Sequence, residues 1–146
     1  MKSEKILRDF AEKSLQNNPK SIEKLELQSL SEEQVKVILE LVGMDLREYK
    51  RIVDNYAVRH THKKHGHEST EKPRGQVAVE CEDFEKITEI IQKPDEQNAG
   101  GVSNIGRQTL VSSKELEKGI YFYVEEIRNK QKELAMQTLY IRKKKG

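Results

Sequence analysis

The last forty residues constrain the fold most, because they hold three segments with the length and composition of β-strands. These segments are Arg107–Val111, Ile120–Arg128 and Leu134–Ile141, and Gly119 and Asn129–Glu133 supply the turns between them. Within the middle segment, hydrophobic and polar side chains alternate between two faces, as expected of a half-buried antiparallel strand. An antiparallel sheet is therefore predicted at this end of the chain.

Helical patterns come before these strands. A helix is predicted from Ser3, its expected N-cap, to Asn17-Asn18-Pro19, with apolar residues at helical spacing. A second helix begins at Ser31, whose spacing to Gln34 is that of a capping box, and ends at Gly43. The stretch between the two, Ile22–Leu30, fits neither pattern clearly.

A third helix is predicted to begin at Asp45 and to end before Gly66. Its buried stripe is expected to contain Ile52, Val53, Tyr56 and Ala57, and a step of three residues from Ala57 reaches His60.

The remaining segments are shorter. A strand is predicted at Gln76–Val79 and a helix from Asp83 to Ile91, before Pro94, while the glycine-rich Asn98–Gly106 is predicted to be a mobile hairpin or substrate loop. Helices followed by strands indicate an α+β fold, with N-terminal helices before an antiparallel β-sheet. We expect a helical region over residues 1–42 and a second domain over residues 43–146.

Composition limits the possible classes of protein. The chain has 146 residues, 36% of them charged, and a net charge of only +2, which fits a globular protein better than a disordered one. The single cysteine, Cys81, excludes an intrachain disulfide and fits a reducing compartment. No apolar run is long enough to span a membrane, and the N-terminus leads into no signal peptide, so we expect a cytoplasmic protein with no membrane partner.

The most informative local feature is a cluster of histidines. The four histidines of the chain, His60, His62, His65 and His67, lie within eight residues, and Arg59 and Lys64 lie among them as candidate substrate-binding residues. On a helix His65 is rotated about 140° from His60, so both reach one ligand only if the helix ends near Lys64. Three alternatives remain for these residues: a buried structural histidine at His60, a solvent-exposed face, and a metal site for which the spacing is poor.

Histidine is also the natural acid or base for cleaving RNA without a metal, when the 2′-hydroxyl attacks the adjacent phosphate. Such a site needs a cation or hydroxyl beside the phosphate and aromatic groups on which bases stack. The last strands supply candidates for these roles, or simply residues that favour strands: Tyr121, Tyr123, Arg128, Thr138 and Tyr140. Thr138 and Tyr140 have the same parity as Leu134 and Met136, which predicts that all four point to one side of the strand.

Eight short segments, taken in order, resemble the phage barnase–EndoU–colicin–RelE-like nuclease domains. They are Gly43–Lys50, Ala57–His60, Lys64–Gly66, Arg74–Gln76, Asp83–Phe84, Pro94–Asp95, Tyr123–Arg128 and Thr138–Tyr140. The resemblance covers about residues 43–145 and implies a barnase-like fold with endoribonuclease activity. It places the histidine positions of the family on His60 and His65 and the strand-end hydroxyl on Thr138, with Tyr140 beside it and Arg128 at the end of the preceding strand.

The function expected from these observations is cleavage of RNA without metal or cofactor. His60, His65, Arg128, Thr138 and Tyr140 are the expected catalytic residues, and Arg59, Lys64, Tyr121 and Tyr123 are expected to bind substrate. The expected partners are RNA and an immunity or antitoxin protein. One alternative is a catalytically inactive RNA- or protein-binding regulator on the same fold, and another is metal-dependent hydrolysis at the histidine cluster.

Overall fold

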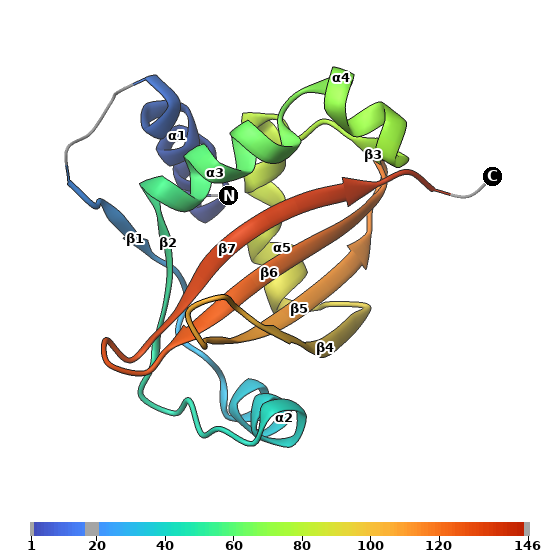
Figure 1. Cartoon of the computed structure of the whole chain (residues 1–146). Helices are drawn as coiled ribbons and strands as arrows, with labels where there is room; N and C mark the ends of the chain where they lie inside the picture. The colour runs from blue at the N-terminus through green and yellow to red at the C-terminus, as the bar shows by residue number, and fades with distance from the viewer. Residues whose placement is uncertain (1, 17–20, 145–146) are drawn as a thin grey trace.

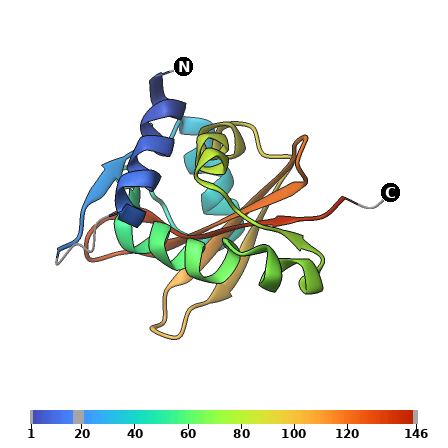
Figure 2. The same cartoon turned by 90° about the horizontal axis from the view of Figure 1, so that it is seen from above.

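The computed structural model describes residues 2–16 and 21–144, and it forms one curved sheet covered by helices on one face (Figures 1 and 2). The helices are α1 (Lys2–Gln16), α2 (Glu32–Val42), α3 (Asn55–His65), α4 (Glu68–Glu71) and α5 (Ile87–Gln92), with 3₁₀ turns η1 (Lys72–Arg74) and η2 (Cys81–Lys86). The strands are β1 (Lys24–Glu26), β2 (Lys50–Asp54), β3 (Gln76–Val77), β4 (Glu96–Val102), β5 (Gln108–Glu115), β6 (Ile120–Arg128) and β7 (Glu133–Arg142).

The sheet is mostly antiparallel. Its strand order is β1-β2-β7-β6-β5-β4, with β3 paired to the far end of β7, and only the pairing of β2 with β7 is parallel. The prediction of an α+β fold with helices before an antiparallel sheet is confirmed, as are the three C-terminal strands. Figure 2 shows α1 and α5 on one side of the sheet, which we call the covered face, while the β4–β5 hairpin extends on the other side, the open face.

The second helix begins and ends as its sequence predicts. The side chain of Ser31 accepts a hydrogen bond from the backbone of Gln34, whose own side chain accepts one from the backbone of Ser31. Gly43 closes the helix with a φ of 72°, a left-handed conformation that glycine adopts without strain. The first helix already begins at Lys2, so Ser3 is not its N-cap, and Asn17, Asn18 and Pro19 lie outside the described residues.

The predicted third helix is wrong over its first half. Residues Lys50–Asp54 form the strand β2, because their β-branched side chains pair in parallel with β7 and fill the core. Helix α3 begins only at Asn55, where the Asp54 side chain accepts a hydrogen bond from the backbone of Ala57 at 2.8 Å. The glycine-rich segment forms part of a hairpin, as predicted: β4 pairs with β5 in antiparallel orientation, with an irregularity between Ala99 and Val102.

Two hydrophobic clusters lie under the covered face. The larger contains Tyr121, Tyr123 and Leu139 and packs against α1, α3 and α5, and the smaller contains Ile127 and Leu134 and packs against α2. Between Tyr123 and Ile127 on strand β6 stands Glu125, whose carboxylate receives two hydrogen bonds of 2.7 Å from Arg51. Both side chains are buried, so this ion pair separates the two clusters.

Candidate active site

A β-bulge decides which residues of the last strand lie on the open face. Glu125 is opposite Met136, but the preceding residue of β6, Val124, is opposite Thr138, so Gln137 is an extra residue in β7. The extra residue reverses the side-chain parity of the strand. Met136 is therefore buried in the core, whereas Thr138 lies on the open face with Val124. The prediction that Leu134, Met136, Thr138 and Tyr140 share one side is wrong for this reason.

The two tyrosines predicted to bind substrate lie on the covered face. Tyr121 and Tyr123 are 1% and 0% exposed, and Tyr121 donates a hydrogen bond to the buried carboxylate of Asp83. Burial, followed by nearby carboxylates, raises the pKa of both phenols. Stacking of bases on these two rings is therefore ruled out by their position, and the aromatic residues on the open face are Phe122 and Tyr140.

Helix α3 lies along the edge of β7, in the gap between the paired segments β2 and β3 (Figure 1). The hydroxyl of Thr61 is 3.4 Å from the hydroxyl of Thr138, which fixes the middle of the helix beside the open face. The buried side of α3 consists of Ala57, Val58 and Thr61. His60 is exposed, contrary to the expected buried stripe, because that stripe was extended from Ile52 and Val53, which are not helical.

His65 is the more enclosed of the two candidate histidines. Its side chain is 15% exposed, and its Nδ1 is 3.1 Å from the fully buried carboxylate of Glu71, which Arg74 also contacts at 3.4 Å. The ring of Tyr140 packs against the His65 ring with centroids 5.5 Å apart. Because Nδ1 is hydrogen-bonded to a carboxylate, Nε2 is the nitrogen left to exchange a proton with a ligand.

His60 opens onto a cavity of about 440 Å³ between the start of α3 and the open face. Tyr56, Gln137 and Arg128 also line this cavity. Desolvation lowers the pKa of His60, and the positive charges of Lys64, His65 and Lys63 lower it further. The lowered pKa favours the neutral form of His60, which is able to accept a proton.

The far side of this cavity holds a network of opposite charges, which we call the arginine end. Arg128 lies 3.3 Å from Asp54, 3.3 Å from Glu126 and 3.6 Å from Glu133. Arg107 binds the second oxygen of Glu126 at 3.1 Å. Two guanidinium groups thus face three carboxylates, and the network has no excess positive charge.

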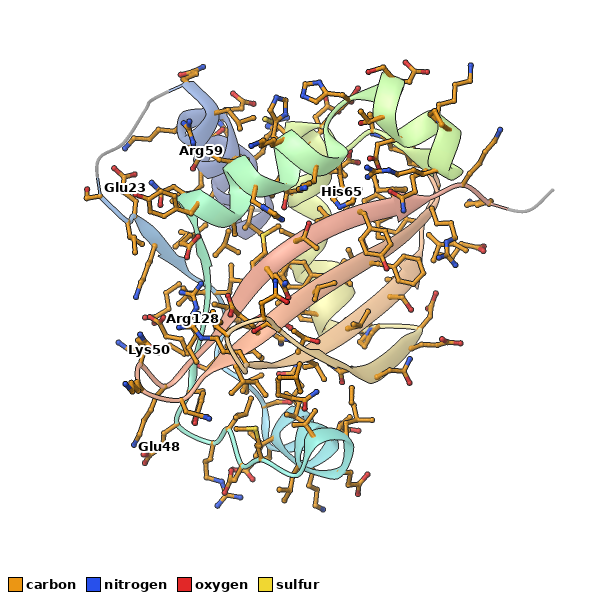
Figure 3. All side chains as sticks on the ribbon, in the orientation of Figure 1. Glu23, Glu48, Lys50, Arg59, His65 and Arg128 are labelled. Carbon is orange, nitrogen blue, oxygen red and sulfur yellow. The ribbon has the colours of Figure 1, made fainter. Side chains whose placement is uncertain are left out.

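The predicted catalytic residues share one face but form two groups. Figure 3 shows His65 near one end of the sheet and Arg128 near the other. Thr138 is opposite Val124, which precedes Arg128 by four residues on β6. Thr138 and Arg128 are therefore about 14 Å apart along the strands. His65, Thr138 and Tyr140 lie together at what we call the histidine end, whereas Arg128 lies with His60 at the cavity.

The predicted substrate-binding cations also differ in position. Lys64 is exposed and follows His60 by four residues, which places it on the same flank of the helix. Arg59 instead donates a hydrogen bond to the backbone oxygen of Ser14 in α1 at 3.4 Å. His62 and His67 pack against each other with ring centroids 4.9 Å apart. Within residues 2–16 and 21–144, no group of three or more histidine, cysteine or acidic residues could hold a metal ion.

Sequence reasoning missed Glu71, Arg107 and Glu126. Glu126 lies two residues before Arg128 on β6, so the two side chains share a face. The alternation of side chains along a strand is enough to predict this. Glu71 belongs to the loop and short helix after α3, and Arg107 precedes β5, so only the folded chain brings them to His65 and Glu126.

Comparison with known families is decisive for the class of protein. Residues 28–146 match the family described as phage-Barnase-EndoU-ColicinE5/D-RelE like nuclease3. The chain belongs to this family. The family is one of nucleases, and its match covers α2 and the strands from β2 to β7, whereas α1 and β1 precede it. Comparison with curated proteins and with solved structures gives no match.

The family match begins ahead of residue 43, where we expected the nuclease domain to begin, and it includes α2. This helix packs under the arginine end through Ile38, in the same cluster as Ile127. No helix among the described residues has the length and apolar character to cross a membrane.

Proposed function

We propose that this family member is a metal-independent endoribonuclease that acts on a phosphate bound beside Thr138. The observation that carries the proposal is the contact between Thr61 and Thr138, because it places the helix that carries His60 and His65 beside this point of the open face. The expected product is a 2′,3′-cyclic phosphate. The reaction forms a bond from the 2′-oxygen to phosphorus and breaks the bond from phosphorus to the 5′-oxygen.

The two histidines have different roles in this proposal. His60 is the base that takes the proton of the 2′-hydroxyl, because its lowered pKa keeps it neutral. His65 is the acid that gives a proton from Nε2 to the departing 5′-oxygen, while Nδ1 stays bonded to Glu71. Glu71 is thus a positioning residue that acts through His65.

The phosphate would be held by hydroxyl groups and by Lys64. Thr138 and Tyr140 lie on the open face beside the helix that carries both histidines, and Lys64 is exposed on the flank of His60. Arg128 was expected to balance the charge of this phosphate, but it lies about 14 Å along the strands from Thr138. We therefore assign Arg128 to the organisation of the arginine end.

One observation favours a second candidate function, an RNA- or protein-binding regulator without catalytic activity. Arg128 contacts three carboxylates, and a phosphate would have to compete with them for this side chain. A family member that had lost its phosphate-binding arginine could still bind RNA on the same face. In either case we expect the protein to act on RNA in the cytoplasm. If it is an active toxin encoded by a phage or a mobile element, we also expect an immunity or antitoxin protein that neutralises it.

The test is to incubate the protein with RNA in excess chelator and to analyse the ends of the products. We expect cyclic phosphate ends, and losses of about 10²- to 10⁴-fold in kcat/KM for His60→Ala and for His65→Ala. His62→Ala and His67→Ala are matched controls, since these rings contact each other, and they should keep nearly full activity.

Three results would contradict the proposal. Binding of RNA without cleavage would favour the regulator, and activity that chelator abolishes and zinc restores would favour metal-dependent hydrolysis. Equal losses in all four histidine variants would contradict the assignment of His60 and His65.

A further inference from the structure

Two basic segments that are far apart in the sequence meet beyond the histidine end. Strand β3 pairs with the end of β7, with Gln76 opposite Arg142, and the backbone of Lys143 donates a hydrogen bond to Gly75 at 2.9 Å. Arg74 immediately precedes this pairing. We call Arg74, Arg142, Lys143 and Lys144 the basic rim; all four residues are exposed.

The rim differs from the arginine end in having almost no nearby acid. Among the described residues, its only ion pair is the contact of Arg74 with Glu71, a carboxylate that His65 also binds. In the strand register, the acidic residue in the row of Arg142 is Glu115, which lies two strands away across Ile120, or about 10 Å. The positive charge of the rim is therefore available to an external anion.

A row of rings connects the rim to the proposed cleavage point. The guanidinium of Arg142 lies 5.2 Å from the centroid of the Phe122 ring. Phe122 and Tyr140 are stacked, with centroids 4.9 Å apart and planes 7° from parallel, and Tyr140 packs on His65. Rings and guanidinium groups are the surfaces on which bases of single-stranded RNA stack. The row therefore suits a nucleotide that follows the cleaved phosphate.

We propose that the basic rim is a binding path for single-stranded RNA, in which these cations hold the phosphates on one side of the cleavage point. The proposal rests on the proposed function for the position of the cleaved bond. In this proposal the bound RNA extends across the protein from Thr138, past Tyr140 and Phe122, to the rim. The arginine end, which has no excess positive charge, contributes little to this path.

The experiment compares two triple variants that remove the same charge. The rim variant is Arg142→Gln with Lys143→Gln and Lys144→Gln, and the control is Lys5→Gln with Lys13→Gln and Lys36→Gln, exposed positions on α1 and α2. Each protein is tested for binding to a 12-nucleotide RNA with 2′-O-methyl groups, which cannot be cleaved, over a range of salt concentrations. Each is also tested for cleavage of a dinucleotide, which is too short to reach the rim.

For the rim variant we expect a Kd for the 12-mer raised on the order of tenfold at low salt. The dependence of log K on log salt should become shallower by about 2, since each lost phosphate contact removes about 0.7 on a single strand. Dinucleotide cleavage should match that of the unchanged protein, and the control triple should change none of these values.

Equal Kd values and salt slopes for the two triples would overturn the proposal. Weaker 12-mer binding by the rim variant, in a protein that cleaves no dinucleotide, would keep the rim and reject the proposed function. A large loss of dinucleotide cleavage in the rim variant would also count against the proposal, because the rim would then belong to the cleavage point itself.

Discussion

At one end of the open face Arg128 contacts three carboxylates, whereas at the other end Arg142 contacts none among the described residues and lies over an aromatic ring. The same type of side chain is thus engaged within the protein in one place and available in the other. Because an anion gains little from a cation that is already neutralised, the histidine end is the better place for RNA. Two arginines on one face therefore need not share one function.

The hydrophobic clusters that pack beneath the two ends differ as well. The larger hydrophobic cluster lies under the histidine end and the smaller one under the arginine end, and the buried pair of Arg51 and Glu125 stands between them. Burial alone lowers the pKa of Arg51, but the charge and hydrogen bonds of Glu125 outweigh this and keep the pKa above its usual value. The guanidinium therefore stays charged inside the core.

The largest effect is expected from breaking this pair. Arg51→Met leaves the carboxylate of Glu125 buried without its partner, and the free energy of unfolding should fall by about 3–5 kcal/mol. Urea denaturation measures the change. The double variant Arg51→Met with Glu125→Leu should recover most of the loss, since two apolar side chains of similar volume can replace a buried pair. If the double variant is no more stable than Arg51→Met, the loss of stability does not come from the unpaired carboxylate of Glu125.

The next largest effect should appear only at the histidine end. Glu71→Gln removes the carboxylate that accepts the Nδ1 proton of His65, and when its amide donates to Nδ1 the ring cannot carry protons on both nitrogens, as the proposed acid requires. We expect kcat for a dinucleotide to fall on the order of 100-fold, with partial recovery in Glu71→Asp. Arg74→Gln is the control, because Arg74 contacts Glu71 but not His65. Equal losses in Glu71→Gln and Arg74→Gln would show that Glu71 acts only through folding.

A smaller effect is expected from a variant that makes the cations of the arginine end available to phosphate, as those near the histidine end are. Glu126→Gln removes the carboxylate that Arg107 and Arg128 share, so both cations become partly available to phosphate. The Kd for the 2′-O-methyl RNA should then fall about threefold to fivefold, and the salt dependence should become steeper. Glu48→Gln changes the charge equally at a surface position and should have no effect. Unchanged binding by Glu126→Gln would mean that RNA never reaches this end.

The smallest effect concerns the acidic side of the pH–rate profile. Activity is lost as the pH falls through the pKa of His60, because the base becomes protonated, and this pKa lies below its usual value. Lys64→Gln removes a positive charge and should raise that pKa, so activity should be lost at a higher pH than in the unchanged protein. Lys63→Gln should cause a smaller shift, since Lys63 contributes less. An identical profile for Lys64→Gln would contradict the role of His60 as base.

Local pattern predicted much of this molecule because the relevant interactions are local. The capping box of Ser31 and Gln34 involves residues three apart, and the alternation along β6 follows from the pleat of any strand. The choice of His60 and His65 rested on resemblance to the family, and their catalytic roles stay predictions. The burial expected for His60 was wrong, because the helical stripe was carried through a strand.

By itself, then, the sequence determined the helix between Ser31 and Gly43, the three C-terminal strands and the alternation of side chains along β6. Tertiary structure decided which face is covered, because Tyr123 is buried in the cluster that packs against the helices and Glu125 is buried with its partner Arg51. It also decided the side of Thr138, since a bulge depends on the partner strand. Which cations are neutralised is likewise a property of neighbours distant in the chain, and no local pattern carries that information.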